Sequence, residues 1–231
     1  FTRDVVGSGA EGDTHDIARR AIEGGPLEVL ARPEPPAVLA LLEAFSRDGR
    51  FLAFLSFAWE AGRITQRGTV MRLDGSGERW SFGERERVVD EVQFSPDGRY
   101  VAYHDNSSGR NEVYVTTVPP SARRWQISTS GGMQPRFRAD GRELFYIAGD
   151  GTLSAVDLRL GPNAAETEAP RPLFKVTPGD KGGFDAYEVS ADGQRFLVRE
   201  VLSFASDEPL VLIANWRSLL PGGLSPAART P

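Results

Sequence analysis

The stretch that decides the fold of this chain is Phe94-Ser95-Pro96-Asp97-Gly98-Arg99-Tyr100-Val101-Ala102-Tyr103. Pro96 fixes φ at about −65°, Asp97 can accept hydrogen bonds from nearby backbone N–H groups, and Gly98 can take the positive φ that closes a hairpin. An aromatic and β-branched run follows, as in a buried strand. The stretch therefore predicts a strand end, a tight turn and a second strand.

The same pattern recurs three more times, each with an aromatic residue or Val three positions before an Asp-Gly pair. The repeats contain Asp48, Asp140 and Asp192, so the four aspartates are 49, 43 and 52 residues apart. A period of about 40–50 residues, with several short strands in each unit, is typical of a β-propeller. We therefore predict an all-β fold, a β-propeller built from four-stranded antiparallel blades.

Turn signals divide the chain into about five blades or part-blades. We expect one propeller domain over residues 1–219, followed by a disordered tail at 220–231. Its units are expected as a partial blade at 1–32, blades at about 38–82, 88–128 and 134–176, and a partial blade at 184–216. Because the end units lack strands and the chain begins at Phe1 rather than Met, we expect a fragment of a larger ring within a longer polypeptide.

Strand positions inside the complete units follow from the apolar runs between turns. In the unit at 38–82 we expect strands at 38–45, 51–57, 69–73 and 78–82. In the unit at 88–128 they are expected at 89–94, 100–104, 112–118 and 124–127. The unit at 134–176 should contain strands at 134–137, 143–148, 153–158 and 171–176, with a polar excursion at 161–170.

The composition excludes several classes of function. The 231 residues carry a net charge of −5 and include no Cys. A nucleic-acid-binding protein needs a basic face, so we expect no nucleic-acid partner. Thiol chemistry, disulfides and Cys-based zinc sites are excluded. No apolar run approaches the roughly 20 residues that span a bilayer, so we expect no membrane contact within this chain.

One motif imitates a cofactor site. Gly7-Ser8-Gly9-Ala10-Glu11-Gly12 matches the G-x-G-x-x-G pattern of dinucleotide-binding folds. Such a site needs a buried parallel strand before the glycines, and Thr2-Arg3-Asp4 is too polar for one. Because nothing downstream alternates strands with helices, we interpret the segment as a Gly-rich loop between antiparallel strands and expect no cofactor.

Catalytic and metal-binding patterns are missing from the sequence. His15 and His104 are the two histidines, and no partner lies at ligand spacing from either. There is no Gly-x-Ser-x-Gly motif of a hydrolase. The Asp-Gly aspartates lie on separate units, so we expect them to cap turns rather than to bind calcium. We therefore predict no catalytic residue, no cofactor-binding residue and no metal ligand.

The usable surface of a propeller is the mouth of its channel, formed by blade-connecting loops and the starts of first strands. A protein or a small molecule of unknown identity could bind there. The alternative is that these polar residues only solvate their loops. On this geometry we predict a binding surface that contains Asp90, Glu91, Gln134, Asp185 and Tyr187.

Several motifs carry a family resemblance. Phe94–Tyr103 resembles the repeat of TolB-type, WD40-like (PD40) propellers. Four further segments resemble the C-terminal propeller of bacterial serine/threonine protein kinases. They are Ser108–Val115, Trp125–Ser128, Gly131–Arg136 and Asp140–Tyr146. The resemblance covers residues 88–217 well and is weaker from 14 to 87.

In that kinase family the propeller follows a kinase domain, often through a membrane-spanning or linker segment. The resemblance implies a non-catalytic sensory or regulatory module, and it favours a periplasmic or other extracytoplasmic location over a cytoplasmic one. Kinase signatures such as the Val-Ala-Ile-Lys, His-Arg-Asp and Asp-Phe-Gly motifs are absent here, so we expect no phosphoryl transfer in this chain. Two alternatives stay open: the substrate-gating propeller of a prolyl-oligopeptidase-like serine peptidase, and a stand-alone periplasmic TolB-like scaffold.

Overall fold

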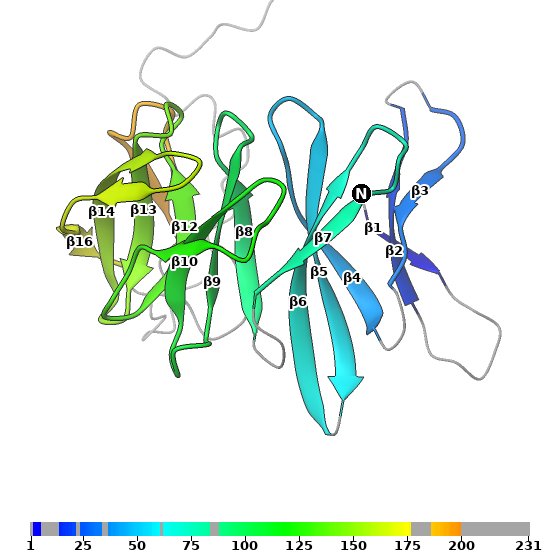
Figure 1. The fold of residues 1–231 in the computed structure, drawn as a ribbon, viewed down its shortest axis with the longest axis horizontal. Helices are drawn as coiled ribbons and strands as arrows, with labels where there is room; N and C mark the ends of the chain where they lie inside the picture. The colour runs from blue at the N-terminus through cyan, green and yellow to red at the C-terminus, as the bar shows by residue number, and fades with distance from the viewer. Residues whose placement is uncertain are drawn as a thin grey trace, which may run out of the picture. The chain divides into compact units, whose positions relative to one another are not determined.

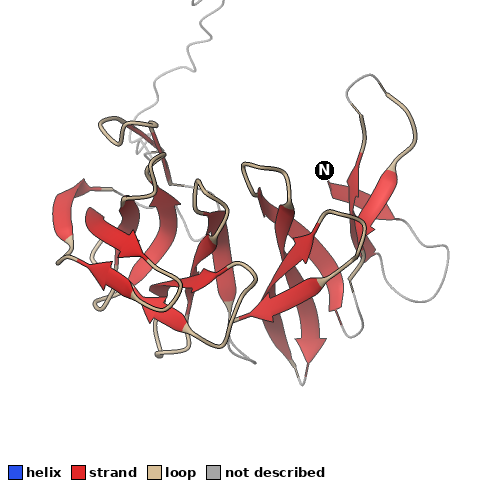
Figure 2. Cartoon of the chain, turned by 45° about the horizontal axis from the view of Figure 1, so that its top comes forward, coloured by secondary structure: helices blue, strands red, loops and turns tan. Residues whose placement is uncertain are grey.

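A computed structural model describes residues 2–5, 14–21, 24–33, 37–60, 62–83, 88–176 and 186–199. All of them belong to one compact unit, Phe1–Glu200. These residues form β-strands joined by turns and loops, with no helix among them (Figures 1 and 2). The predicted all-β class is therefore confirmed.

The first four-stranded sheet is longer than expected at one end. It contains β4 (Ala37–Phe45), β5 (Phe51–Glu60), β6 (Arg63–Arg72) and β7 (Arg79–Phe82), all antiparallel. β5 and β6 pair without interruption from Phe51↔Arg72 to Glu60↔Arg63. The sequence predicted β6 only from Thr69, because five of the six residues before it are polar or Gly. Pairing with the apolar β5 extends β6 by six residues and creates a long hairpin.

The next sheet agrees with its expected strands to within two residues. It contains β8 (Val89–Phe94), β9 (Tyr100–Asp105), β10 (Glu112–Thr117) and β11 (Arg124–Gln126), in the antiparallel order β11-β10-β9-β8. Tyr100–Asp105 is buried along its whole length. Both faces of this strand are covered, as expected for a sheet that lies between two neighbouring sheets.

A third sheet follows the same order. It contains β12 (Gly132–Phe137), β13 (Glu143–Ala148), β14 (Thr152–Leu160) and β16 (Arg171–Lys175). The expected polar excursion at 161–170 contains a further short strand, β15 (Ala165–Thr167), which pairs with the outer end of β14. The long β14 thus pairs with β16 at one end and β15 at the other.

Shorter sheets lie before and after these three. β1 (Thr2–Val5), β2 (Thr14–Arg19) and β3 (Glu28–Ala31) form an antiparallel group that a single parallel bridge, His15↔Leu39, joins to β4. β17 (Tyr187–Val189) and β18 (Phe196–Val198) form a two-stranded sheet. The Gly-rich segment 7–12, the predicted binding residue Asp185 and the predicted tail 220–231 lie outside the described residues.

The Asp-Gly corners are built alike. At the central corner the Ser95 hydroxyl donates to Asp97 Oδ1 at 2.6 Å and accepts from the Tyr100 N–H at 3.0 Å, while Gly98 has φ +69°. The corners at Asp48 and Asp192 repeat these bonds from Ser46 and Ser190. The predicted role of these aspartates as turn caps is confirmed.

At the remaining corner an arginine replaces the serine. Arg138 Nε donates to Asp140 Oδ1 at 2.8 Å, and this bond is the main cause that lowers the pKa of Asp140 to about 2. At the first corner it is the Ser46 hydroxyl that lowers the pKa of Asp48 to about 2. Arg138 and Ser46 thus stabilise the same kind of turn, and each keeps the aspartate of its corner ionised.

The hydrophobic core lies between the sheets rather than inside any one of them. One cluster joins β4–β7 to β8–β11 and includes Leu55, Val70, Phe94 and Tyr103. Two further clusters join β8–β11 to β12–β16, and β12–β16 to β17–β18. Each sheet therefore packs face to face on the next, which is the stacking of propeller blades.

Candidate ligand-binding surface

The first strands of successive sheets lie next to one another and form a wall. β8 packs against both β4 and β12. A hollow of about 1120 Å³ is lined by residues of β4, β8, β12 and β17, the four strands that each lead into an Asp-Gly corner. We call this surface the inner wall. In a propeller the first strands line the channel, so the inner wall is the part of the fold where ligands have access.

Equivalent bulges interrupt two of these strands. Glu91 and Gln134 each lie six residues before their corner aspartate, and they have φ values of 55° and 54°. The strand register shifts at both places, between Asp90 and Gln93 and between Met133 and Arg136. A side chain in this left-handed region costs about 1 kcal/mol, so the surrounding structure must hold both residues there.

Four of the five predicted binding residues form a connected group at this wall, but only Asp90 and Glu91 line the hollow. Gln134 and Tyr187 are buried behind it, 8% and 2% exposed. Gln134 Nε2 donates to Glu91 Oε1 at 3.2 Å, and the Tyr187 hydroxyl donates to the Gln134 carbonyl at 2.8 Å. The Glu91 N–H donates to Asp90 Oδ1 at 3.0 Å. The sequence placed these residues at the starts of first strands, and the structure brings them together across β8, β12 and β17.

Sequence reasoning missed the cation at the centre of this group. Arg136 lies 3.5 Å from a Glu91 carboxylate oxygen and 3.6 Å from one of Glu188, and its side chain is only 7% exposed. Its guanidinium carbon is also 6.0 Å from the centroid of the Tyr187 ring. The available signal was its position two residues after Gln134, on the same side of a predicted first strand.

Side chains of the inner wall also fasten each sheet to the next. Glu43 Oε2 accepts from the Val92 N–H at 3.0 Å, and Gln93 Oε1 accepts from the Phe137 N–H at 2.6 Å. Gln134 Oε1 accepts from the Ala186 N–H at 2.8 Å. In all three cases a first-strand side chain of one sheet binds a backbone amide at the first strand of the following sheet. We call these bonds the inter-sheet latches.

His104 lies directly behind the inner wall. It is paired with Asp90 in the register of β8 and β9, it is buried, and its Nδ1 has no hydrogen-bond partner within the described part of the chain. Burial, followed by the positive charge of Arg136, lowers the pKa of His104 to about 4. The imidazole is therefore neutral at physiological pH.

The inner wall is acidic. Its lining includes four carboxylates, Glu43, Asp90, Glu91 and Glu188, against the guanidinium groups of Arg47 and Arg136. Within the described ranges, no group of three or more His, Asp or Glu side chains is arranged to hold a metal ion. Nor do those ranges contain a helix that is long and apolar enough to cross a membrane.

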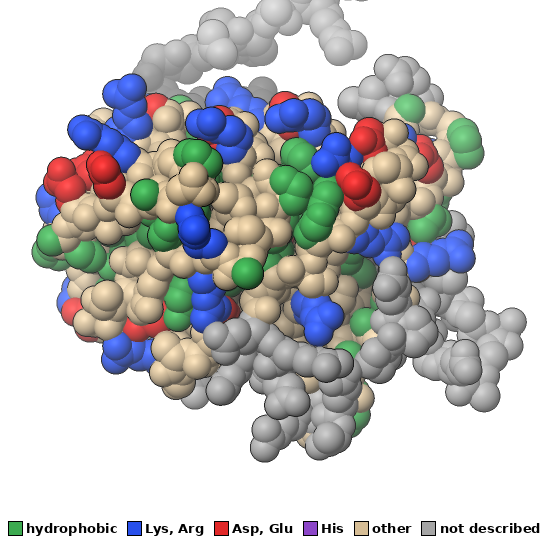
Figure 3. Space-filling model, in the orientation of Figure 1, with side chains coloured by type: hydrophobic (Ala, Val, Ile, Leu, Met, Phe, Trp, Pro, Cys, Tyr) green, Lys and Arg blue, Asp and Glu red, His purple; other side chains and the backbone are tan. Residues whose placement is uncertain are grey.

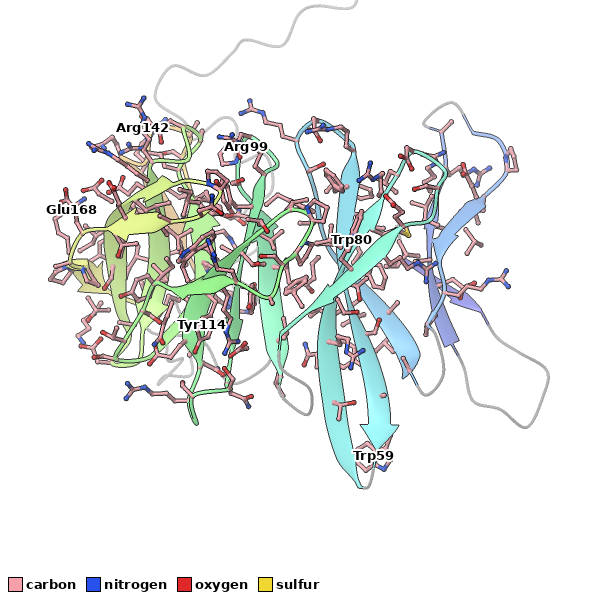
Figure 4. All side chains as sticks on the ribbon, viewed as in Figure 1. Trp59, Trp80, Arg99, Tyr114, Arg142 and Glu168 are labelled. Atoms are coloured by element: carbon pink, nitrogen blue, oxygen red, sulfur yellow. The ribbon has the colours of Figure 1, made fainter. Side chains whose placement is uncertain are left out.

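A second hollow, of about 1070 Å³, lies beside the Asp-Gly corners. Its lining balances five arginines against five carboxylates, among them Arg99, Arg142 and Glu168. Figure 3 shows basic and acidic side chains intermixed along this end, where Figure 4 labels Arg99 and Arg142. Because the charges balance, this hollow shows no preference for a ligand of either sign.

Comparison with known proteins supports the fold and not a specific function. No protein-family model and no curated protein sequence matches the chain. TolB from Acinetobacter baumannii is similar in structure, with a TM-score of 0.54, 16% identity, and coverage of 81% of this chain and 44% of TolB. An oligogalacturonate lyase in complex with manganese has a TM-score of 0.54 and 13% identity, over 80% of this chain and 50% of the lyase.

These similarities show that the chain has a β-propeller fold of the kind found in TolB, which confirms the predicted fold class. The chain spans about half the length of each of the two proteins. At 16% identity or below, the likeness concerns the fold, while the choice of ligand depends on the side chains of the inner wall.

Proposed function

We propose that this chain is a non-catalytic binding module, and that a protein or small-molecule ligand binds to the inner wall at Asp90 and Glu91, with the buried Gln134 and Tyr187 supporting Glu91 from behind. One observation carries the proposal. Glu91 and Gln134 occupy equivalent bulges in a strained conformation and are hydrogen-bonded to each other across two sheets. Backbone strain of this kind collects at ligand sites, where the surrounding fold maintains it.

We propose further that the whole protein is a bacterial serine/threonine protein kinase and that this module is its C-terminal sensory part, outside the cytoplasm. The sequence resemblance between Ser108 and Tyr146 supports this proposal. A peptidase propeller and a stand-alone scaffold stay the alternatives. Incubating the full-length protein with labelled ATP tests the choice: autophosphorylation is expected, and its absence would leave the alternatives.

Site-specific photo-crosslinking tests the binding surface. A benzoylphenylalanine placed at Glu188, which is 58% exposed on the inner wall, should form an adduct in cells that express the full-length protein. The same probe at Arg142, at the corner end of the fold, serves as the matched control (Figure 4). Equal adducts at both positions, or none at residue 188, would contradict binding at the inner wall.

A further inference from the structure

We infer that the β5–β6 hairpin extends the inner wall, and that the two together bind an extended basic segment of a partner protein that carries an apolar residue. This inference rests on the proposed function and names the class of ligand. Its basis is a strand pair that runs past the neighbouring sheets and leaves an apolar face uncovered.

The hairpin projects because its neighbours stop. β4 pairs with β5 no further than Ala58, and β7 pairs with β6 only from Gly68 to Met71. On the next sheet, Val88 forms a single parallel bridge to Gln66, just before β8 begins. The end of β5 from Trp59 and the start of β6 at Arg63–Thr65 therefore extend beyond the adjoining strands, and Figure 4 shows Trp59 at the tip of the hairpin.

The uncovered face of this tip is apolar. Trp59 and Ile64 are directly opposite each other in the β5–β6 register, and they are 65% and 58% exposed. Alternation along the strands places them on the same face as Phe51, Leu55 and Val70, which pack against β8 in the core. At the tip, no described strand covers this face as β8 covers it in the core. Trp59 and Ile64 are therefore an apolar pair with no other described strand packed against them.

This face is continuous with the inner wall. Phe57 and Gln66, the next cross-strand pair on the same face as Trp59 and Ile64, both line the wall's hollow. A ligand that lies along the wall therefore reaches the exposed pair without leaving the surface.

The backbone of the tip can add a strand. Arg63–Thr65 lies beyond the end of β7, and no described strand pairs with this edge of β6. Natural proteins cover or blunt such edges, and an extended peptide can pair with one through its main chain. The edge therefore favours an extended polypeptide over a compact small molecule.

Charge decides the chemistry of that segment. The wall next to the hairpin carries two more carboxylates than guanidinium groups, and Arg136 is already engaged by Glu91 and Glu188. Lys or Arg side chains complement this surface, whereas an acidic segment is repelled. An aliphatic side chain beside them can cover Trp59, whose indole also attracts a neighbouring cation.

A random peptide library tests the inference. Twelve-residue peptides displayed on phage are selected on the full chain, and the enriched peptides are then synthesised and measured by fluorescence anisotropy. We expect Lys- or Arg-rich sequences with an aliphatic position. Their Kd should rise about tenfold for the double variant Trp59→Ser/Ile64→Thr, the loss of about 1.4 kcal/mol that one uncovered apolar pair implies.

Matched variants separate the inference from the proposed function. Leu197→Ser removes a 77% exposed apolar side chain from β18 and should leave the Kd unchanged. Glu188→Lys should weaken binding as the hairpin variant does. Peptides that respond to Glu188→Lys and not to the hairpin variant would overturn the inference and retain binding at the wall. Peptides whose Kd changes with neither variant would overturn both the inference and the proposed binding at the inner wall.

Two other results would also overturn the inference. One is enrichment of acidic peptides, or no enrichment at all. The other is self-association: if sedimentation shows that the chain is a dimer and the Trp59→Ser/Ile64→Thr variant a monomer, the occupant of the hairpin is a second copy of the chain.

Discussion

Two neighbouring sheets, β4–β7 and β8–β11, share one end and differ at the other. At the shared end, Ser46 and Ser95 make the same bonds to the aspartate of their corner. At the opposite end β9 and β10 stop after six residues each, whereas β5 and β6 run for ten. The first sheet projects a hairpin where the second closes in a compact turn.

Two buried carboxylates explain the compact turn. Asp105 is fully buried and accepts from Arg124 Nη1 at 2.7 Å, and Glu112 accepts from Ser128 Oγ and from the Gly131 N–H. Both tie the β9–β10 connection back to β11 and the chain after it. Ser56 occupies the position equivalent to Asp105 in the first sheet, and a serine has no carboxylate with which to form this ion pair.

The two ends of one repeat have different tasks. The corner depends on residues within six positions of one another, so every copy that keeps them keeps its shape. The opposite end depends on one or two side chains that each copy can gain or lose. Variation there changes the surface presented to a ligand without changing the stacking of the sheets.

Breaking the tie should produce the largest effect. Arg124→Met leaves the Asp105 carboxylate buried beside Ser107 alone, and we expect the free energy of unfolding to fall by about 3–5 kcal/mol. Urea denaturation followed by circular dichroism measures the loss. Arg123→Met, at an exposed neighbouring position, should change stability by less than about 0.5 kcal/mol. Equal losses for the two variants would show that the tie does not hold the turn.

Acid should destabilise the second sheet selectively through His104. Its pKa is lowered to about 4, so the unfolded chain binds the extra proton first as the pH falls below 6.5. Stability should therefore decrease by about 3 kcal/mol between pH 7 and pH 4 on account of this one residue.

His104→Leu is the matched variant, because Leu55 occupies the equivalent position of the first sheet. The difference in unfolding free energy between wild type and variant should change across pH 4–7. A difference that is constant across this range would mean that His104 titrates normally.

The shared corner should respond to a smaller change. Ser95→Ala removes the hydroxyl that bridges Asp97 and the Tyr100 N–H, and we expect a loss of about 1 kcal/mol. Thermal unfolding measures it. Ser121→Ala, at an exposed position, provides the reference and should leave the Tm within about 1 °C of wild type. No difference between the two serine variants would indicate that backbone bonds alone hold the corner.

Removing the projecting tip should have the smallest effect on stability. Replacing residues 59–64 with Asn-Gly joins Ala58 to Thr65, a cross-strand pair, by a two-residue turn. Because Trp59 and Ile64 are 65% and 58% exposed and no described strand except β6 pairs with β5 beyond Ala58, we expect the free energy of unfolding to stay within about 0.5 kcal/mol of wild type. A loss of more than about 2 kcal/mol would show that the hairpin stabilises the fold rather than only presenting a surface.

The sequence allowed prediction of everything that short-range pattern controls. Turn chemistry predicted the four corners, at Asp48, Asp97, Asp140 and Asp192. Apolar runs predicted most of the strands between them. The length of β6 was not predicted, because only Ile64 and Thr65 in Arg63–Gly68 favour a strand, and the whole segment pairs with β5. Tertiary context overrode local preference at that point.

The inner wall, where we propose that a ligand binds, was predictable in part. The rule that first strands line a propeller channel led to the prediction of Asp90, Glu91, Gln134 and Tyr187. Their bonds to one another depend on bulges that rotate Glu91 and Gln134, and a bulge at a non-Gly residue leaves no signal in one sequence. Arg136 and Glu188 were not predicted, although each is close to a predicted residue: Arg136 lies two residues after Gln134, and Glu188 follows Tyr187 directly.

The inter-sheet latches affect how a protein of this kind can gain repeats in evolution. In each latch the side chain belongs to one repeat and the group it grips is a main-chain N–H of the next, which every residue except proline possesses. A gene segment that encodes one repeat can therefore be copied or exchanged and still grip whatever repeat follows it. Duplication of a whole unit keeps the fastening intact without any compensating substitution in the neighbour.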